Sequence, residues 1–136
     1  MERHYRYSDD IYEEKFKSGK FPPLYFSHEA HLRLAYIHIK KYRLEQSIQH
    51  MGRQIYHFAI KYGATMKFNA TVTYASLQIM NRYMQQSESD HSSDFIKEFP
   101  SLSEDFKGII KQHYSQDIFR SPEAKATILY PDLVPF

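Results

Sequence analysis

The sequence contains no cysteine and no tryptophan, and only four glycines and six prolines among its 136 residues. Without cysteine the chain cannot form a disulfide, a thiolate metal site or a cysteine nucleophile. So little glycine and proline is untypical of a disordered or loop-rich chain. No segment approaches the roughly 18 consecutive apolar residues that a membrane-spanning helix needs. No apolar stretch of a secretory signal follows Met1, so we expect a cytoplasmic protein without a membrane segment.

A large excess of charge of one sign is also missing, because the formal net charge is +2 and the pI is about 8.7. Nucleic-acid-binding proteins usually gather lysine and arginine on one face. The densest basic stretch, Lys40–Arg43, ends a predicted helix, where cations interact favourably with the helix dipole. We therefore expect no nucleic-acid partner.

Aromatic residues are abundant instead, with 12 tyrosines and 10 phenylalanines. They must supply much of the buried surface, and buried tyrosines need partners for their hydroxyl groups. A chain of this length closes one hydrophobic core. The sequence therefore predicts a single domain over residues 1–136.

Hydrophobic periodicity and capping residues predict helices along most of the chain. Ser8 precedes a short helix that Gly19 ends, and Ser27 is a good N-cap for a helix from about His28 to about Tyr42. A second long amphipathic helix follows over residues 44–62, and Gly63 is its expected C-terminal cap. Gly52 within this helix suggests a close helix crossing. A third helix of about sixteen residues is expected near residues 69–84.

The C-terminal third is predicted as shorter elements. These are a polar flexible loop over residues 85–93, a helix over residues 94–99, a helix that Ser101 or Ser103 begins, and a helical start at Ser121-Pro122. The fold class is therefore all-α, a single-domain bundle of four to five helices with an extended C-terminal tail. Within it we expect a loosely packed N-terminal segment over residues 1–25, core helices over residues 27–84, and C-terminal helices and tail over residues 94–136.

The candidate chemistry centres on two histidines, His28 and His31, one helical turn apart at the start of the first core helix. Both imidazoles fall on the apolar stripe that Leu32 continues. They are either metal ligands or hydrogen-bonded groups that pack with tyrosine hydroxyls, Thr73 or backbone. Two ligands are too few for Zn²⁺, so a third would come from Asn69, Glu29, His38, His57 or His113. Three other histidines are expected to face solvent: His4, His50 and His91.

Polar residues also open the third helix, where Asn69 and Thr73 share one face. A site between the two helix starts would contain His28 and His31 as metal ligands or proton carriers. Its orienting groups would be Arg33, Asn69 and Thr73. The metal would be a transition metal such as zinc, iron or copper. The sequence contains no nucleophile elbow and no glycine-rich phosphate loop, so the type of reaction stays open.

Three motifs together resemble a family of small, uncharacterised bacterial proteins built entirely of helices. They are Phe26-x-His28-x-x-His31-Leu32-Arg33-x-Ala35, Lys67-Phe68-Asn69-x-Thr71, and Ser121-Pro-Glu-Ala124 followed by Pro131-Asp132-Leu133-x-Pro135. The resemblance covers about residues 24–136, and it implies a helical fold and a site near the histidine pair. Where the family pattern reads Lys-Tyr-His-Glu-Thr, this chain has Lys67-Phe-Asn-Ala-Thr71. It therefore lacks the third imidazole and the carboxylate that the family pattern implies.

Two functions are compatible with these features. The first is a metal- or small-ligand-binding protein, whether catalytic or not, built on the His28–His31 pair. The alternative is a non-catalytic protein–protein interaction module or homo-oligomer, in which the histidines only pack. Tyrosine-rich surfaces favour such interfaces.

Overall fold

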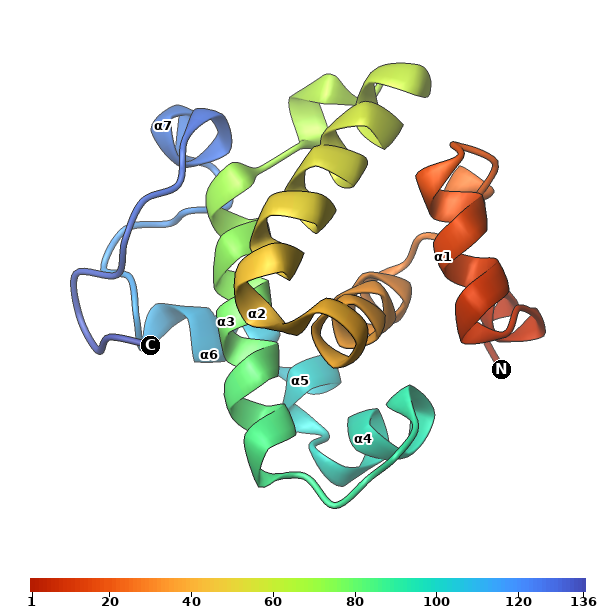
Figure 1. Ribbon diagram of the computed structural model, residues 1–136. Helices are drawn as coiled ribbons and strands as arrows, with labels where there is room; N and C mark the ends of the chain where they lie inside the picture. The colour runs from red at the N-terminus through yellow and green to blue at the C-terminus, as the bar shows by residue number, and fades with distance from the viewer. The chain divides into compact units, whose positions relative to one another are not determined.

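The computed structural model describes residues 1–136 and consists of helices without β-strands. The α-helices are α1 (Asp9–Lys17), α2 (His28–Lys61), α3 (Ala70–Gln86), α4 (Ser92–Glu98), α5 (Ser101–Glu104), α6 (Phe106–Lys111) and α7 (Pro122–Ala126), as Figure 1 shows. Three 3₁₀-helices join them: η1 (Arg3–Arg6), η2 (Pro23–Tyr25) and η3 (Thr65–Lys67). The all-α prediction is confirmed, whereas the predicted count of four to five helices is not. None of the helices is both long and apolar enough to span a membrane.

The chain forms two compact units, residues 1–68 and residues 69–136. We call them the N-terminal unit and the C-terminal unit and describe each separately. The expectation of one domain over the whole chain stays a prediction.

The N-terminal unit is built on α2, which changes direction at Arg43 (Figure 1). The backbone of Arg43 has φ 65° and ψ 174°, far from helical values. It divides α2 into a first arm, residues 28–42, and a second arm, residues 44–61. This agrees with the two helices that the sequence predicts on either side of residue 43. Gly63 follows the second arm with φ 66°, and this conformation suits its role as the C-terminal cap.

Helix α1 packs against both arms of α2. The Tyr12 hydroxyl donates to the carbonyl of Ala30 in the first arm at 2.5 Å. The Phe16 ring stacks on Phe58 of the second arm with ring centroids 4.6 Å apart. Phe21, which follows α1, is fully buried. The prediction that residues 1–25 pack loosely is therefore wrong, because their aromatic side chains supply part of the core.

Gly52 does not mark a close helix crossing, as the sequence suggested. A Cβ atom built on Gly52 would meet no heavy atom within 4 Å. The residue lies within the continuous helix of the second arm and serves no packing contact there.

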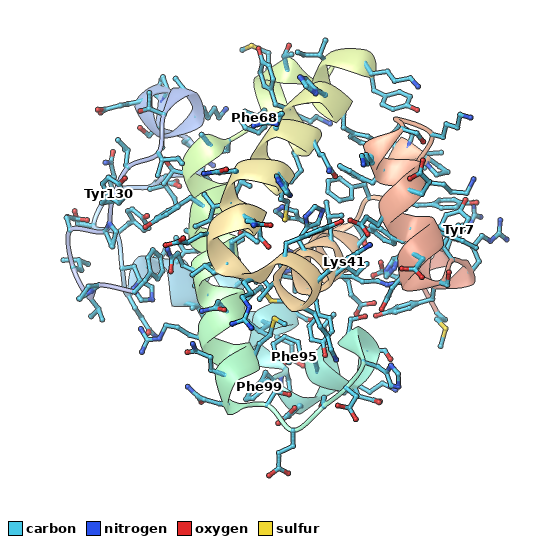
Figure 2. The ribbon with its side chains drawn as sticks, viewed as in Figure 1. Tyr7, Lys41, Phe68, Phe95, Phe99 and Tyr130 are labelled. Carbon is cyan, nitrogen blue, oxygen red and sulfur yellow. The ribbon has the colours of Figure 1, made fainter.

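In the C-terminal unit, α3 and α7 are joined through the buried side chain of Thr71. Its hydroxyl donates to the carbonyl of Thr127 at 2.7 Å and accepts from the amide of Leu129 at 2.9 Å. Nearby, the Tyr74 and Tyr130 rings meet edge to face with centroids 5.7 Å apart. Tyr130 lies on the segment that follows α7 (Figure 2). The end of the chain is thus fastened to the first turns of α3.

The connections in this unit differ from those predicted. The Glu98 carboxylate accepts hydrogen bonds from the hydroxyls of Ser87 and Ser89, at 2.5 and 2.7 Å, and so ties the loop after α3 to α4. The single helix expected after Pro100 is split at Asp105. The backbone of Asp105 leaves the helical region, and its carboxylate accepts from the amide of Gly108 at 3.2 Å, which starts α6.

Candidate functional site

The predicted histidine pair lies in the first turn of α2. The hydroxyl of Ser27 caps this turn by accepting from the amide of Ala30 at 3.1 Å. His28 is exposed, so the expectation that both imidazoles face the core is wrong for this residue. His31 is partly buried and meets the Phe26 ring edge to face, with centroids 5.5 Å apart. Burial, together with the charge of His28, lowers the pKa of His31 to about 4, so its imidazole is neutral at physiological pH.

Arg33, predicted to orient groups around that pair, serves another part of the unit. Its buried guanidinium donates to the Asp9 carboxylate at 2.9 Å and to the backbone carbonyls of His4 and Tyr7 at 2.8 and 2.7 Å. These bonds hold the first residues of the chain against the first arm of α2. Its role here is structural.

His4 is completely buried in the same region, contrary to the expectation that it faces solvent. Its Nε2 atom lies 3.2 Å from Glu2 Oε1 and 3.7 Å from Glu29 Oε2. The ligand atoms of these three residues all lie within 4.8 Å of one another, a spacing that would suit a metal ion. We call them the Glu2–His4–Glu29 cluster.

The other ring nitrogen of His4 decides whether a metal fits this cluster. Arg33 Nη1 lies 3.3 Å from His4 Nδ1, and a guanidinium can only donate. His4 Nδ1 must therefore accept, and the neutral ring carries its proton on Nε2, facing the two carboxylates. A metal-bound histidine instead offers the lone pair of that atom and donates its other N–H to an acceptor. The cluster thus fits a shared proton better than a metal ion.

Asn69 and Thr73, the remaining predicted site residues, belong to α3 in the C-terminal unit. The side-chain oxygen of Asn69 caps α3 by accepting from the backbone amide of Val72 at 2.9 Å. The side-chain nitrogen of Asn69 donates to the carbonyl of Ile118 at 2.7 Å. Both ends of this side chain therefore have structural partners. Thr73 is buried in the first turn. The assembly of these residues with His28 and His31 into one site stays a prediction.

A different polar cluster forms where α1 meets the bend of α2. Glu13 of α1 is almost fully buried and accepts from Lys41 Nζ at 2.8 Å and from the Tyr42 hydroxyl at 2.5 Å. Burial alone would raise the pKa of Glu13, but these two hydrogen bonds outweigh it and hold the pKa below its usual range. Glu13 is therefore ionised at neutral pH, with its charge balanced by Lys41. Lys41 is labelled in Figure 2 beside this bend.

His38 is the central residue of this bend cluster. Its side chain is fully buried, and neither ring nitrogen has a hydrogen-bond partner. Burial lowers its pKa to about 4, against the attraction of the Glu13 charge. Gln54 Oε1, in the second arm, is also buried without a partner of normal geometry, yet the Gln54 side chain lies near enough to raise the pKa of His38 by hydrogen bonding. The ring N–H can therefore be directed at Gln54 Oε1, which leaves the other ring nitrogen as an acceptor that the protein does not use.

Tyrosine and histidine rings bring the two arms together at the bend. The Tyr42 ring lies 5.6 Å from that of His38 and 5.4 Å, edge to face, from that of His50. His50 is partly buried rather than solvent-facing as expected. Between these residues Arg43 has a backbone conformation that only glycine adopts readily. Strain of this kind costs about 1–3 kcal/mol and is concentrated at functional sites.

The bend cluster was only partly visible in the sequence. His38 was one of five candidates for a third ligand, whereas no pattern in the sequence singled out Glu13 or Gln54. The useful signal was the boundary that the sequence predicts between two helices at residue 43. The chain changes direction at that residue, which brings side chains of the two arms near the bend.

Comparison of the chain with protein-family models, with curated proteins and with solved structures finds no match. The resemblance to a family of small bacterial helical proteins therefore stays a prediction. The function has to be argued from the geometry of the two units.

Proposed function

We propose that the protein binds a small, uncharged polar molecule at the bend of α2, with His38 as its main hydrogen-bonding group. The observation that carries the proposal is the fully buried ring of His38, whose nitrogens have no hydrogen-bond partner of normal geometry. Buried polar atoms in folded proteins are nearly always hydrogen-bonded, and each one left alone costs about 1–3 kcal/mol. A buried imidazole with an unused acceptor nitrogen supports a ligand that donates to it.

The chemistry of these atoms defines the ligand. With its N–H directed at Gln54 Oε1, a neutral His38 offers one accepting nitrogen. A matching molecule presents at least one donor, as primary amides and small polyols do. The nearby charges of Glu13 and Lys41 already neutralise each other at 2.8 Å, so the cluster favours an uncharged ligand over an ion.

The same features favour binding over catalysis. A histidine whose pKa is about 4 is a weak base at neutral pH, and general bases work best when their pKa lies near the operating pH. Glu13, the other candidate base, already accepts from Lys41 and Tyr42.

The test is to replace His38 with phenylalanine, which keeps the ring but removes both nitrogens. Ring ¹⁵N signals of His38 are recorded in the wild-type protein during titration with acetamide and with glycerol, with exposed His57 as the internal reference. We expect a saturable shift at His38 with at least one probe and none at His57. Unfolding of H38F should need as much denaturant as unfolding of the wild type, or more.

The opposite result is equally clear. If neither probe moves the His38 signals and H38F unfolds at a lower denaturant concentration than the wild type, the ring nitrogens are satisfied inside the protein and the proposal fails.

Metal binding by His28 and His31 is a second candidate, favoured by the neutral state of His31. Metals bind the uncharged imidazole, and burial keeps His31 in that form. The measurement is elemental analysis of untagged protein beside the double variant His28→Ala/His31→Ala, with His57→Ala/His91→Ala as the matched control. About one equivalent of zinc, iron or copper in the wild type and the control, but not in the double variant, would support this site. Equal metal content in all three proteins would exclude it.

A further inference from the structure

The C-terminal unit contains a cavity that takes no part in the function proposed above. Its volume is about 600 Å³, within the usual range of small-molecule pockets. It lies beside α6, and its walls include Lys107, Lys111, Ile110, Ile118, Phe119 and Leu133.

Hydrogen bonds from three directions hold the walls in place. The Asn69 amide fixes the carbonyl of Ile118 at 2.7 Å. The amide of Ser115 donates to the Asp132 carboxylate at 3.0 Å, and the hydroxyl of Ser115 donates to the same carboxylate. The amide of Leu133 donates to the carbonyl of His113 at 3.0 Å. The cavity is therefore formed before any ligand arrives, which lowers the entropic cost of binding.

Most polar groups of the wall are already engaged. The Tyr114 hydroxyl donates to the carbonyl of Leu129 at 2.8 Å. The Asp117 carboxylate accepts from the amide of Phe119 at 3.0 Å. The Ser115 hydroxyl is bonded to Asp132, and the Asp117 carboxylate also lies 3.9 Å from the Arg120 guanidinium. This leaves the lysines as the charged groups of the wall without an ion-pair partner.

Lys107 and Lys111 are four residues apart on α6 and therefore lie on one side of that helix. Both are exposed, and neither forms an ion pair with a carboxylate of the protein. Lys107 Nζ lies 5.3 Å from the centre of the Phe119 ring. Two cations thus border the leucine and phenylalanine side chains that the cavity wall exposes.

We propose that this cavity binds an amphipathic organic anion. Its carboxylate, sulfonate or phosphate group would pair with Lys107 and Lys111, and its apolar body would cover Phe119 and Leu133. The site is independent of His38, so either proposal can fail without the other.

The test uses 8-anilinonaphthalene-1-sulfonate, an aromatic sulfonate that fluoresces when bound to an apolar site. The wild type is titrated beside Lys107→Gln/Lys111→Gln and beside a control with the same charge change outside the cavity, Lys67→Gln/Lys97→Gln. We expect saturable binding to one site, a dissociation constant at least tenfold weaker in the cavity variant, and little change in the control. Uncharged N-phenyl-1-naphthylamine should bind the wild type and the cavity variant alike.

Near-ultraviolet circular dichroism of each variant checks that the fold is intact, because this probe also binds partly unfolded protein. A second variant, Leu133→Ser, keeps both lysines and should weaken both probes. Equal binding of the sulfonate to the cavity variant and to the control would overturn the proposal, as would binding that does not saturate in any of the proteins.

Discussion

The N-terminal unit buries charged side chains, whereas the C-terminal unit buries only hydroxyl groups and one imidazole. Glu13 and Arg33 are both less than a tenth exposed in the first unit. The buried polar residues of the second unit are Thr71, Thr73, Ser76, Ser92 and His113.

The polar groups also differ in what they bind. In the C-terminal unit, Thr71 and His113 bond to backbone atoms of residues 127–134, so their role is to fasten the end of the chain. In the N-terminal unit, charge pairs fix α1, and the ring nitrogens of His38 have no partner; in the C-terminal unit the buried Ser76 hydroxyl also has none. Polar groups that a fold does not need for itself are the ones available for a ligand.

The largest expected effect tests whether buried charge holds the N-terminal unit together. Arg33→Met removes the cation that binds the carboxylate of Asp9 and the carbonyls of His4 and Tyr7. The Asp9 carboxylate is about half exposed and can be hydrated, but the two carbonyls lose their donor at about 1–3 kcal/mol each, so we expect a loss of that order in urea unfolding. Arg82→Met is the control, because Arg82 is exposed and reaches only the carbonyl of Pro135 at 3.4 Å. Equal losses of unfolding free energy in both variants would show that the buried guanidinium of Arg33 stabilises its unit no more than an exposed arginine does.

A second prediction concerns acid. The pKa values of His31 and His38 are lowered to about 4 in the folded protein, while the ordinary value is about 6.5. Between these values the unfolded chain takes up protons that the folded chain does not, so stability falls as the pH falls from 6.5 to 4. The slope is at most about 1.4 kcal/mol per pH unit for each histidine. H38F should lack the part of this pH dependence of stability that His38 contributes.

Glu13 affects the stability of the protein at lower pH than the two histidines do. Its pKa is lowered in the folded state, so its contribution is present above its ordinary pKa and is lost as the pH falls through the lowered one. Three charged or titratable groups act on the pKa of His38: Glu13 raises it, and His50 and Lys41 lower it. Glu13→Gln removes the one that raises it. Denaturant unfolding of E13Q and H38F at several pH values separates the two effects. An unchanged pH profile in H38F would contradict the assignment.

The third prediction breaks the fastening in the C-terminal unit. Thr71→Val keeps the shape of the side chain but leaves the carbonyl of Thr127 and the amide of Leu129 without their partner. We expect a loss of about 1–3 kcal/mol, measured by thermal unfolding. Thr127→Val is the matched control, because the Thr127 hydroxyl reaches only the carbonyl of Glu123 at an exposed position.

The smallest effect is a gain. Gly52→Ala adds a methyl group that meets nothing within 4 Å, and alanine favours the helix over glycine by about 1 kcal/mol. A stabilisation of this order, seen as a higher urea midpoint with unchanged slope, would show that Gly52 serves no packing role. Destabilisation would instead indicate that Gly52 packs closely against another helix, as the sequence suggested.

Local signals predicted much of the secondary structure. Ser8, Ser27, Ser121 and Gly63 cap helices as expected, because capping depends on residues within one turn. The split at Asp105 was missed, since a carboxylate that starts a helix looks the same as one in its first turn.

The sites were harder to predict because their contacts are distant in sequence. His4 is buried through Arg33, which lies 29 residues later. Glu13 depends on Lys41 and Tyr42, 28 and 29 residues away. A helical periodicity shows which face of a helix is apolar, but it does not show which polar residue another segment will cover.

The bend at Arg43 has a further consequence for how the chain assembles. A straight α2 of 34 residues would be about 50 Å long, and α1 could then reach only one of its arms. The second arm would be left to take up α1 from another molecule, which is the exchange seen in domain-swapped dimers. Arg43→Ala, which favours a helical backbone at this position, is therefore expected to raise the dimer fraction in size-exclusion chromatography. Arg43→Gly should leave the dimer fraction of the wild type unchanged. The strained residue would then act as a safeguard against self-association.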